Sequence, residues 1–136
     1  MDARYELREH TADVGVAASG PTLDSVFGAL ADGLAAAQCD EIPDSGERFS
    51  FSLAAERRDA LLFDYLDQLI YERDVRLVLP VDNEVRVDTD RWRLDASARG
   101  VPLGAVEARE VKAVTYSEMR IEEREEGWEA YVVLDV

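Results

Sequence analysis

The sequence predicts an α+β fold: a single domain in which a mostly antiparallel sheet carries two helices packed on one face. A length of 136 residues is typical of one domain, and no repeat or flexible linker divides the chain, so we treat residues 1–136 as a unit. Two segments show helical spacing of apolar residues, and the other apolar residues alternate in short segments joined by hairpin-length loops.

The two helices are indicated by apolar residues three and four positions apart. The first is expected over Leu23–Ala37. Thr22 is its expected N-cap and directly follows Gly20-Pro21, a pair that interrupts regular secondary structure. The second is expected over Asp59–Tyr71. Each has one apolar stripe, so each is expected to bury that stripe against the sheet.

The strands are indicated by alternation of apolar and polar residues between turn-forming residues. They are expected at Arg4–Glu9, Val14–Ser19, Arg48–Ala54, Val75–Val81, Glu84–Asp88, Arg91–Arg99, Val111–Tyr116, Met119–Glu123 and Trp128–Asp135, with a tight turn at Asp82-Asn83 and a loop at Gly100–Gly104. The order of these strands in the sheet does not follow from the sequence.

The composition is that of a soluble protein, since 47% of the residues are hydrophobic but no apolar run is long enough to span a membrane. The N-terminus lacks the pattern of a signal peptide, so a cytoplasmic location is expected. The single cysteine, Cys39, allows no internal disulfide and is best interpreted as a small packing residue.

The charge is strongly acidic, with 30 acidic against 15 basic residues, a formal charge of -15 and a pI near 4.3. A direct nucleic-acid binder usually has a basic surface, which argues against that class. The acidity fits either a partner with a basic surface or adaptation to high salt, and the scarcity of lysine favours a halophilic source. Lys112 is the only lysine; either it stands there by chance, or this position needs a compact ammonium group in place of a planar guanidinium.

The usual catalytic patterns are missing from the sequence. The only histidine is His10, and there is no nucleophile elbow, phosphate-binding loop or zinc-ligand spacing. Carboxylates remain, and their positions distinguish them.

Asp13 ends the short polar turn that begins at His10, and Asp135 lies beside the terminal carboxylate of Val136. If the first and last strands are neighbours, three carboxylates converge there, and a hard cation such as calcium or magnesium would relieve their repulsion. Spacing alone favours simpler roles: a turn residue for Asp13, a frayed tail for Asp135 and a structural residue for His10.

Three segments together resemble the archease family. They are the opening Tyr5-Glu6-Leu7 with His10-Thr11-Ala12-Asp13-Val14-Gly15, the signature Val111-Lys112-Ala113-Val114-Thr115-Tyr116, and the ending Tyr131-Val132-Val133-Leu134-Asp135-Val136. The helical segment Phe63–Tyr71 also matches in place and character, so the resemblance extends over nearly the whole chain.

The resemblance implies a protein cofactor, not an enzyme, that activates an RtcB-type RNA ligase in tRNA splicing by promoting its guanylylation and its multiple turnover. RNA and GTP would be met indirectly, through the ligase. It also implies the archease fold of strand-helix-strand-strand modules and a calcium ion, or another divalent cation, at an acidic site. By residue match, Asp13, Asp135 and Val136 would hold the metal, and Lys112, with His10, would serve activation.

One departure is visible: many members of the family have histidine where Ser117 follows Tyr116. This puts in doubt any mechanism that needs a second histidine. Two other functions stay open, namely a small metal-dependent hydrolase or nucleotide-processing enzyme built on the same carboxylates, and a chaperone-like interaction module. The hydrolase lacks a clear nucleophile and a phosphate-binding loop.

Overall fold

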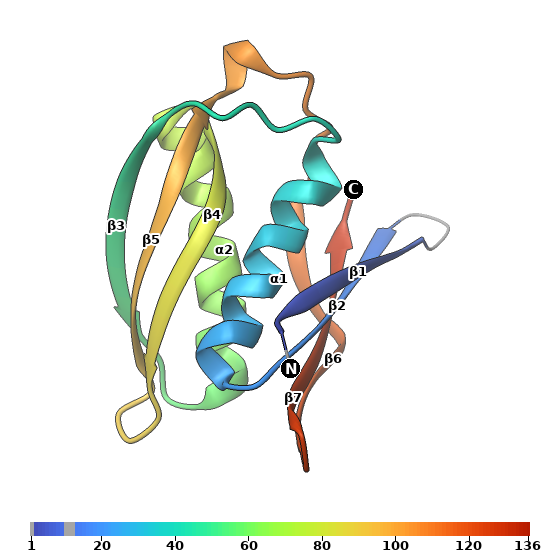
Figure 1. Ribbon diagram of the computed structural model, residues 1–136, viewed down its shortest axis with the longest axis vertical. Coiled ribbons are helices and arrows are strands. Elements are labelled where there is room, and N and C mark those ends of the chain that lie inside the picture. Colours follow the sequence, from blue (N-terminus) through green and yellow to red (C-terminus); the bar gives the residue numbers. More distant parts are fainter. Residues whose placement is uncertain (1, 10–12) are drawn as a thin grey trace.

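The computed structural model describes residues 2–9 and 13–136, and it contains two helices between two antiparallel sheets (Figure 1). The elements in chain order are β1 (Arg4–Glu9), β2 (Asp13–Gly20), α1 (Leu23–Gln38), β3 (Glu47–Ala54), α2 (Arg58–Arg76), β4 (Val78–Asp88), β5 (Arg93–Pro102), a short 3₁₀ turn (Leu103–Ala105), β6 (Ala113–Arg124) and β7 (Gly127–Asp135). The predicted α+β class, with two helices and a mainly antiparallel arrangement of strands, is confirmed.

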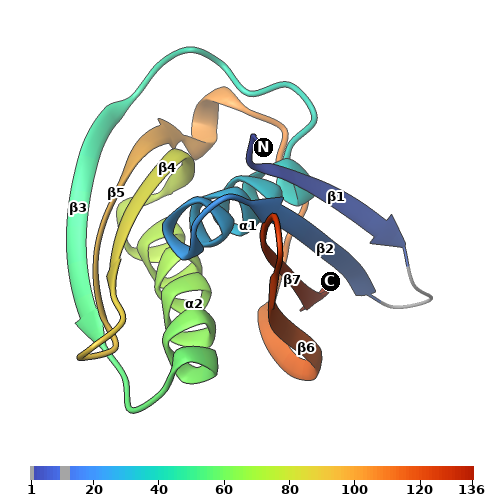
Figure 2. The ribbon, with the colours of Figure 1, turned by 60° about the horizontal axis from the view of Figure 1, so that its bottom comes forward.

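The strands divide into a four-stranded sheet with the order β1-β2-β7-β6 and a three-stranded sheet with the order β3-β5-β4. All pairings are antiparallel. The helices cover one face of each sheet and form a shared middle layer, which the turned view also shows (Figure 2). The second strand, β2, therefore lies beside the last strand, β7, and β1 and β6 are the two edges.

The core lies where α1 and α2 face the two sheets. Phe27 of α1 stacks on Tyr65 of α2 with ring centroids 6.1 Å apart, and Leu30, Leu66 and Leu134 are also fully buried. Burial of each such side chain contributes roughly 1.5–3 kcal/mol. The same helical layer therefore stabilises both sheets, and each sheet keeps an outer face directed away from the helices.

Helix α1 begins as expected, because Thr22 accepts a hydrogen bond from the Ser25 N–H and the Ser25 hydroxyl oxygen accepts one from the Thr22 N–H. This reciprocal cap satisfies backbone donors that have no partner inside the helix. The cap fixes the direction in which the chain leaves β2. It thereby holds α1 against the four-stranded sheet.

Two predicted boundaries around α2 were wrong. The helix continues to Arg76, and the next strand begins at Val78 instead of Val75. Basic side chains in the last helical turn are favourable near the negative end of the helix dipole. The helix ends only where Leu77 adopts a left-handed conformation with φ 56°.

The predicted turn at Asp82-Asn83 is instead a bulge inside the continuous strand β4. Asp82 has φ 47°, and the Asn83 N–H and Nδ2 both donate to Asp32 Oδ1 of α1, at 3.0 and 2.9 Å. A side chain on the helix therefore satisfies the backbone that the bulge releases from the strand ladder.

Strand β6 contains a similar irregularity. It was expected as two segments but forms one strand, in which the pairing with β7 shifts between Thr115 and Arg120. Glu118, inside this shift, has φ 61°. Tyr116 projects from the irregular part and stacks on Phe63 of α2 at 4.2 Å between ring centroids. The bulge therefore connects β6 to the helical layer.

Candidate functional site

The candidate site lies at one end of the four-stranded sheet, where β2 begins and β7 ends. Asp13 and Asp135 are direct cross-strand partners. Opposite residues of an antiparallel pair point to the same face, with Cβ atoms about 4.5–5.5 Å apart, and like charges in such positions repel. Asp13 is half-buried and Asp135 is exposed. The two carboxylates that the sequence singled out are therefore brought together.

Lys112 reaches the same end of the sheet from the other side of β7. Its backbone N–H donates to the Asp135 carbonyl at 2.8 Å, and the next residue, Ala113, is paired with Asp135 in the strand register. The Asp135 backbone is thus held between β2 and β6. Lys112 is exposed, as is Val136, which follows Asp135 at the end of the chain. His10 lies outside the described residues.

The segment that leads to Lys112 is fixed by an arginine of α2. Arg73 Nη1 donates to the Val111 carbonyl at 2.8 Å and to Gln38 Oε1 at 2.9 Å. The Arg73 side chain is only 11% exposed and Gln38 is 2% exposed, so little solvent competes for these hydrogen bonds. Residues of α1 and α2 therefore hold the backbone immediately before Lys112.

Arg109 attaches the same segment to the end of α1. Its backbone N–H donates to the Gln38 carbonyl at 2.6 Å, and its guanidinium reaches the Ala37 carbonyl and both Asp40 carboxylate oxygens. The hydrogen bond from Arg109 and the charge of its guanidinium lower the pKa of the Asp40 carboxyl. Satisfying the last carbonyls of a helix is a common use of arginine.

Sequence reasoning missed Arg73, Gln38 and Arg109. Each of these residues contacts an element distant in the sequence, and no local spacing of residue types predicts such a contact. The only available signal was the basic charge near the C-terminal end of the second helix.

The side chains at this end of the sheet are of the kind that a hard cation prefers, but they are too few to hold one by themselves. Calcium and magnesium prefer carboxylate and carbonyl oxygens, which Asp13, Asp135 and the chain end offer. Within residues 2–9 and 13–136, however, no group of three or more acidic, histidine or cysteine side chains is placed to hold a metal. A cation here would therefore need further oxygen ligands from the chain end, from water or from a partner.

Comparison with known proteins decides the family. A model of the Archease protein family matches residues 5–136. The chain belongs to the archease family. It is 36% identical to the archease of Thermococcus gammatolerans over 98% of this chain and 99% of that one. It is 32% identical to the archease of Methanosarcina acetivorans, over 98% of this chain and 96% of the relative.

Two solved structures have the same fold as this chain. Protein 1598 of Methanobacterium thermoautotrophicum is 30% identical, with a TM-score of 0.82 over 97% of this chain and 98% of that chain. An archease of Thermotoga maritima, described as a possible chaperone, is 22% identical, with a TM-score of 0.67 over 96% of each chain. Among the described residues of this chain, no helix is long and apolar enough to cross a membrane.

Proposed function

We propose that this member of the archease family activates an RtcB-type RNA ligase in tRNA splicing, and that the end of the sheet formed by Asp13, Asp135 and Lys112 is the part that acts on the ligase. One observation supports this most directly. The N-terminal motif, the second signature and the C-terminal strand, distant in the sequence, meet where Asp13 pairs with Asp135 and the Lys112 N–H binds the Asp135 carbonyl.

In this proposal Asp13, Asp135 and the terminal carboxylate of Val136 hold a calcium ion or another divalent cation. Such a cation, when bound, supplies positive charge for phosphate oxygens. The two aspartates fix where that charge lies, because both are held by the strand ladder. The Lys112 ammonium adds a second, mobile positive charge beside it. Nucleotide and RNA would stay on the ligase, so chemistry occurs there and this protein is a cofactor.

The arrangement favours a cofactor over a hydrolase for a structural reason. The site is at an exposed end of a sheet, and Asp135, Lys112 and Val136 are all exposed. A hydrolase usually encloses its substrate in a pocket with a few converging polar groups. An open acidic end with a nearby ammonium is better suited to completing the active site of a partner.

The test is multiple-turnover RNA ligation by the cognate ligase with GTP and manganese, at a salt concentration where circular dichroism shows this protein to be folded. The wild type at substoichiometric dose should raise turnover. Asp13→Ala and Lys112→Ala should each lose most of that stimulation and keep the wild-type fold.

Matched controls are Asp90→Ala and Arg91→Ala, which remove the same charges from the exposed β4–β5 hairpin at the opposite end of the molecule (Figure 1). They should stimulate like the wild type. Full stimulation by Asp13→Ala would refute the acidic site. If the wild type gives no stimulation but hydrolyses a phosphate substrate alone, the protein is an enzyme.

A further inference from the structure

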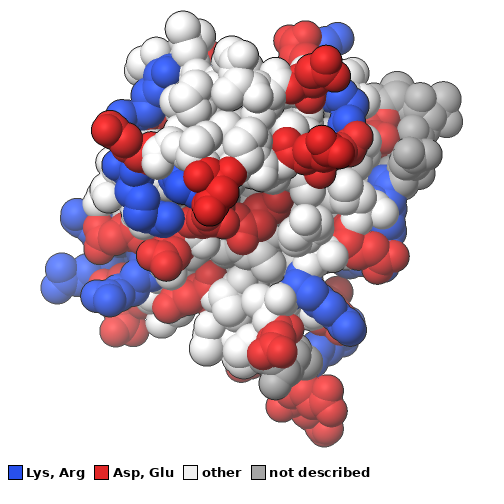
Figure 3. Space-filling model, turned by 45° about the horizontal axis from the view of Figure 1, so that its top comes forward, with Lys and Arg blue, Asp and Glu red and all other residues white. Residues whose placement is uncertain are grey.

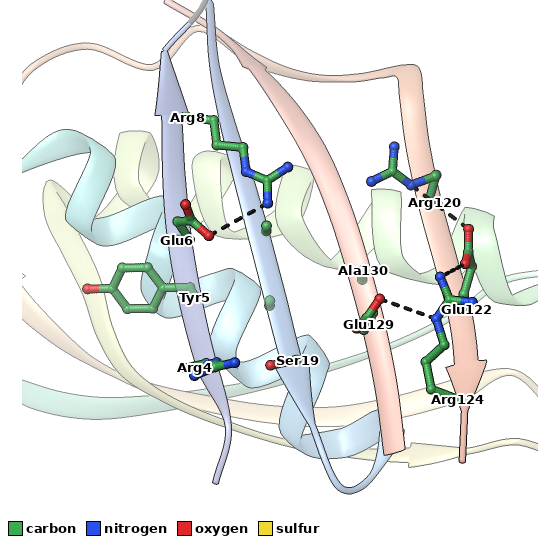
Figure 4. A pocket seen from close by; sticks show the side chains of 12 residues that line it. Arg4, Tyr5, Glu6, Arg8, Ser19, Arg120, Glu122, Arg124, Glu129 and Ala130 are labelled. Atoms are coloured by element: carbon green, nitrogen blue, oxygen red, sulfur yellow. Dashed lines mark hydrogen bonds and ion pairs between the residues drawn. The ribbon is translucent and has the colours of Figure 1, made fainter. Parts of the chain in front are cut away.

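Four arginines gather on the outer face of the four-stranded sheet, although the chain as a whole carries a formal charge of -15. They border a cavity of about 550 Å³, which we call the arginine trough. Arg4 and Arg8 come from β1, and Arg120 and Arg124 come from β6. Figure 4 shows Arg4 and Arg8 on the β1 side and Arg120 and Arg124 on the β6 side, with the Arg8 guanidinium reaching over β2.

The floor of the trough is made of small residues. Ala17 and Ser19 of β2 face outward between the rows, and their partners across the sheet are Glu6 and Arg4 on β1 and Tyr131 and Glu129 on β7. The rows stand on β1 and β6, three strand spacings apart, which is about 14 Å. The side chains occupy part of this width. The remaining space suits one extended nucleic-acid strand and is too narrow for a duplex.

Tyr131 positions the guanidiniums of Arg8 and Arg120. Its ring is only 5% exposed, with the Arg8 guanidinium 5.8 Å and the Arg120 guanidinium 5.0 Å from the ring centroid. Contacts of this kind hold the planar groups over the ring and limit their motion. Both side chains remain more than half exposed, so their hydrogen-bond donors stay accessible from the trough.

Three carboxylates alternate with the arginines and identify the chemistry of the ligand. Glu6 lies 3.6 Å from Arg8, Glu129 lies 3.3 Å from Arg124, and Glu122 pairs with Arg120 and Arg124. A polyglutamate segment and an RNA strand would both bring negative charge near these carboxylates, but the side chains of polyglutamate offer them no hydrogen-bond donor. An RNA strand carries phosphates that suit guanidinium forks, and base amino groups and 2′-hydroxyls that donate to carboxylates.

At the end nearer the candidate site the cavity is bordered by Arg8, Ala17 and Arg120, and the Tyr131 ring, which covers Gly15, lies between the cavity and that site. Asp13 and Ala17 point to the same face of β2 and lie four residues apart, or about 13 Å along the strand. An RNA strand that continued past Ala17 in this direction would cross the Tyr131 ring and the Arg8 and Arg120 guanidiniums before it reached the carboxylates of Asp13 and Asp135. On the face that Figure 3 presents, by contrast, acidic and basic side chains are interspersed around an uncharged area.

We propose that the arginine trough binds a single RNA strand and guides it along β2 to the acidic end of the sheet. The inference rests on the proposed function for the source of the RNA, the substrate of the ligase. In this proposal the protein contacts RNA itself, whereas the sequence analysis expected contact only through the ligase. The overall acidity does not oppose this over short distances, because salt screens distant charges within about 10 Å at 0.1 M and more strongly at higher salt.

Binding of a fluorescently labelled, mixed-sequence RNA of about ten nucleotides, a usual site size for single-strand binders, tests the proposal by anisotropy across a potassium chloride series. The double variant Arg8→Gln/Arg120→Gln should raise Kd at least about fivefold, because charge-assisted bonds to phosphate are lost. Ala17→Glu should do the same by placing a negative charge on the floor, and it keeps every arginine.

The matched control is Arg86→Gln/Arg93→Gln, which removes two exposed arginines from the outer face of the three-stranded sheet and changes the net charge equally. It should bind RNA like the wild type. Equal loss in both double variants would mean general charge attraction and would overturn the proposal, as would no binding by the folded wild type.

Binding of a polyglutamate peptide in place of RNA would also overturn the RNA proposal and assign the trough to an acidic protein segment. Because the ligase is absent from these measurements, a negative result would leave the proposed activation to be judged by the ligation assay. The two proposals therefore fail separately.

Discussion

The two sheets pack on the same helical layer but present different outer faces. On the three-stranded sheet the polar side chains bond to one another: Arg48 reaches Ser97, and Ser52 donates to Asp95 at 2.5 Å. On the four-stranded sheet the central strand β2 offers only small residues beyond Asp13, and charged side chains stand along the sides. Both outer faces border a cavity, of about 400 Å³ on the three-stranded sheet and about 550 Å³ on the four-stranded sheet, but only the second is lined by four arginines.

The difference follows from where the chain ends lie in each sheet. The four-stranded sheet places β2 and β7, from the two ends of the sequence, side by side at its centre. The motifs at both ends therefore share one surface. The three-stranded sheet is built from consecutive middle elements and helps to bury the helices. The proposed site therefore lies at the four-stranded sheet, while both sheets bury the helices.

The largest effect on stability should come from the centre of the four-stranded sheet. Leu134 of β7 is fully buried, and Leu134→Ala should lower the free energy of unfolding by about 2–5 kcal/mol through lost burial and a cavity. Leu53 of the edge strand β3 is only half-buried, so Leu53→Ala should cost about 1–2 kcal/mol. Urea unfolding at one fixed salt concentration measures both, and equal losses would contradict the central role of β7.

A smaller loss of stability should come from a change at Gly15 of β2, which the Tyr131 ring covers beside the trough. A Cβ on Gly15 would overlap the Tyr131 hydroxyl and ring, so Gly15→Ala must displace that ring and should cost about 1–3 kcal/mol. Gly104 has no atom within 4 Å of the same position, so Gly104→Ala should change stability by less than about 0.5 kcal/mol.

A double-mutant cycle sharpens this test. Combining Gly15→Ala with Tyr131→Leu should cost less than the sum of the two single changes, since the smaller side chain removes the clash. Additive losses would show that the cost of Gly15→Ala arises in the backbone of β2 and not in its contact with Tyr131.

Local sequence patterns predicted most of this fold, because alternation and helical spacing are local properties. The Thr22 cap and the exact extent of β1 were confirmed for that reason. Patterns failed where a distant side chain decides the backbone: the bulge at Asp82-Asn83 depends on Asp32, and the strand shift after Thr115 accompanies the stacking of Tyr116 on Phe63.

The candidate site shows the same limit. Asp13 and Asp135 were selected by their positions near chain features, and the structure places them opposite one another. The resemblance, not the spacing, selected Lys112. No pattern indicated Arg73, whose contact with Val111 joins residues 38 positions apart. The metal and activation roles stay predictions.

The smallest expected effect concerns Asp32, where α1 meets the three-stranded sheet. Burial raises its carboxyl pKa, although the hydrogen bonds from Asn83 act in the opposite direction. A pKa that is higher in the folded state means that stability falls as pH rises through that value, because folding then disfavours the ionised form. Asp32→Asn keeps an acceptor for Asn83 and removes the charge, so it should be slightly more stable than the wild type at neutral pH.

That advantage should shrink as pH falls and the wild-type carboxyl takes up its proton, which thermal unfolding across a pH series measures. Asp40 gives the opposite control. Arg109 lowers its pKa, so its contribution is present above the unfolded value and is lost as pH falls through the folded one. Asp40→Asn should therefore weaken the protein only toward neutral pH. The stability difference between wild type and Asp32→Asn could instead stay constant across the pH series. That result would show that burying the charged form of Asp32 does not destabilise the protein, and that the bulge in β4, not the charge, sets the stability of this junction.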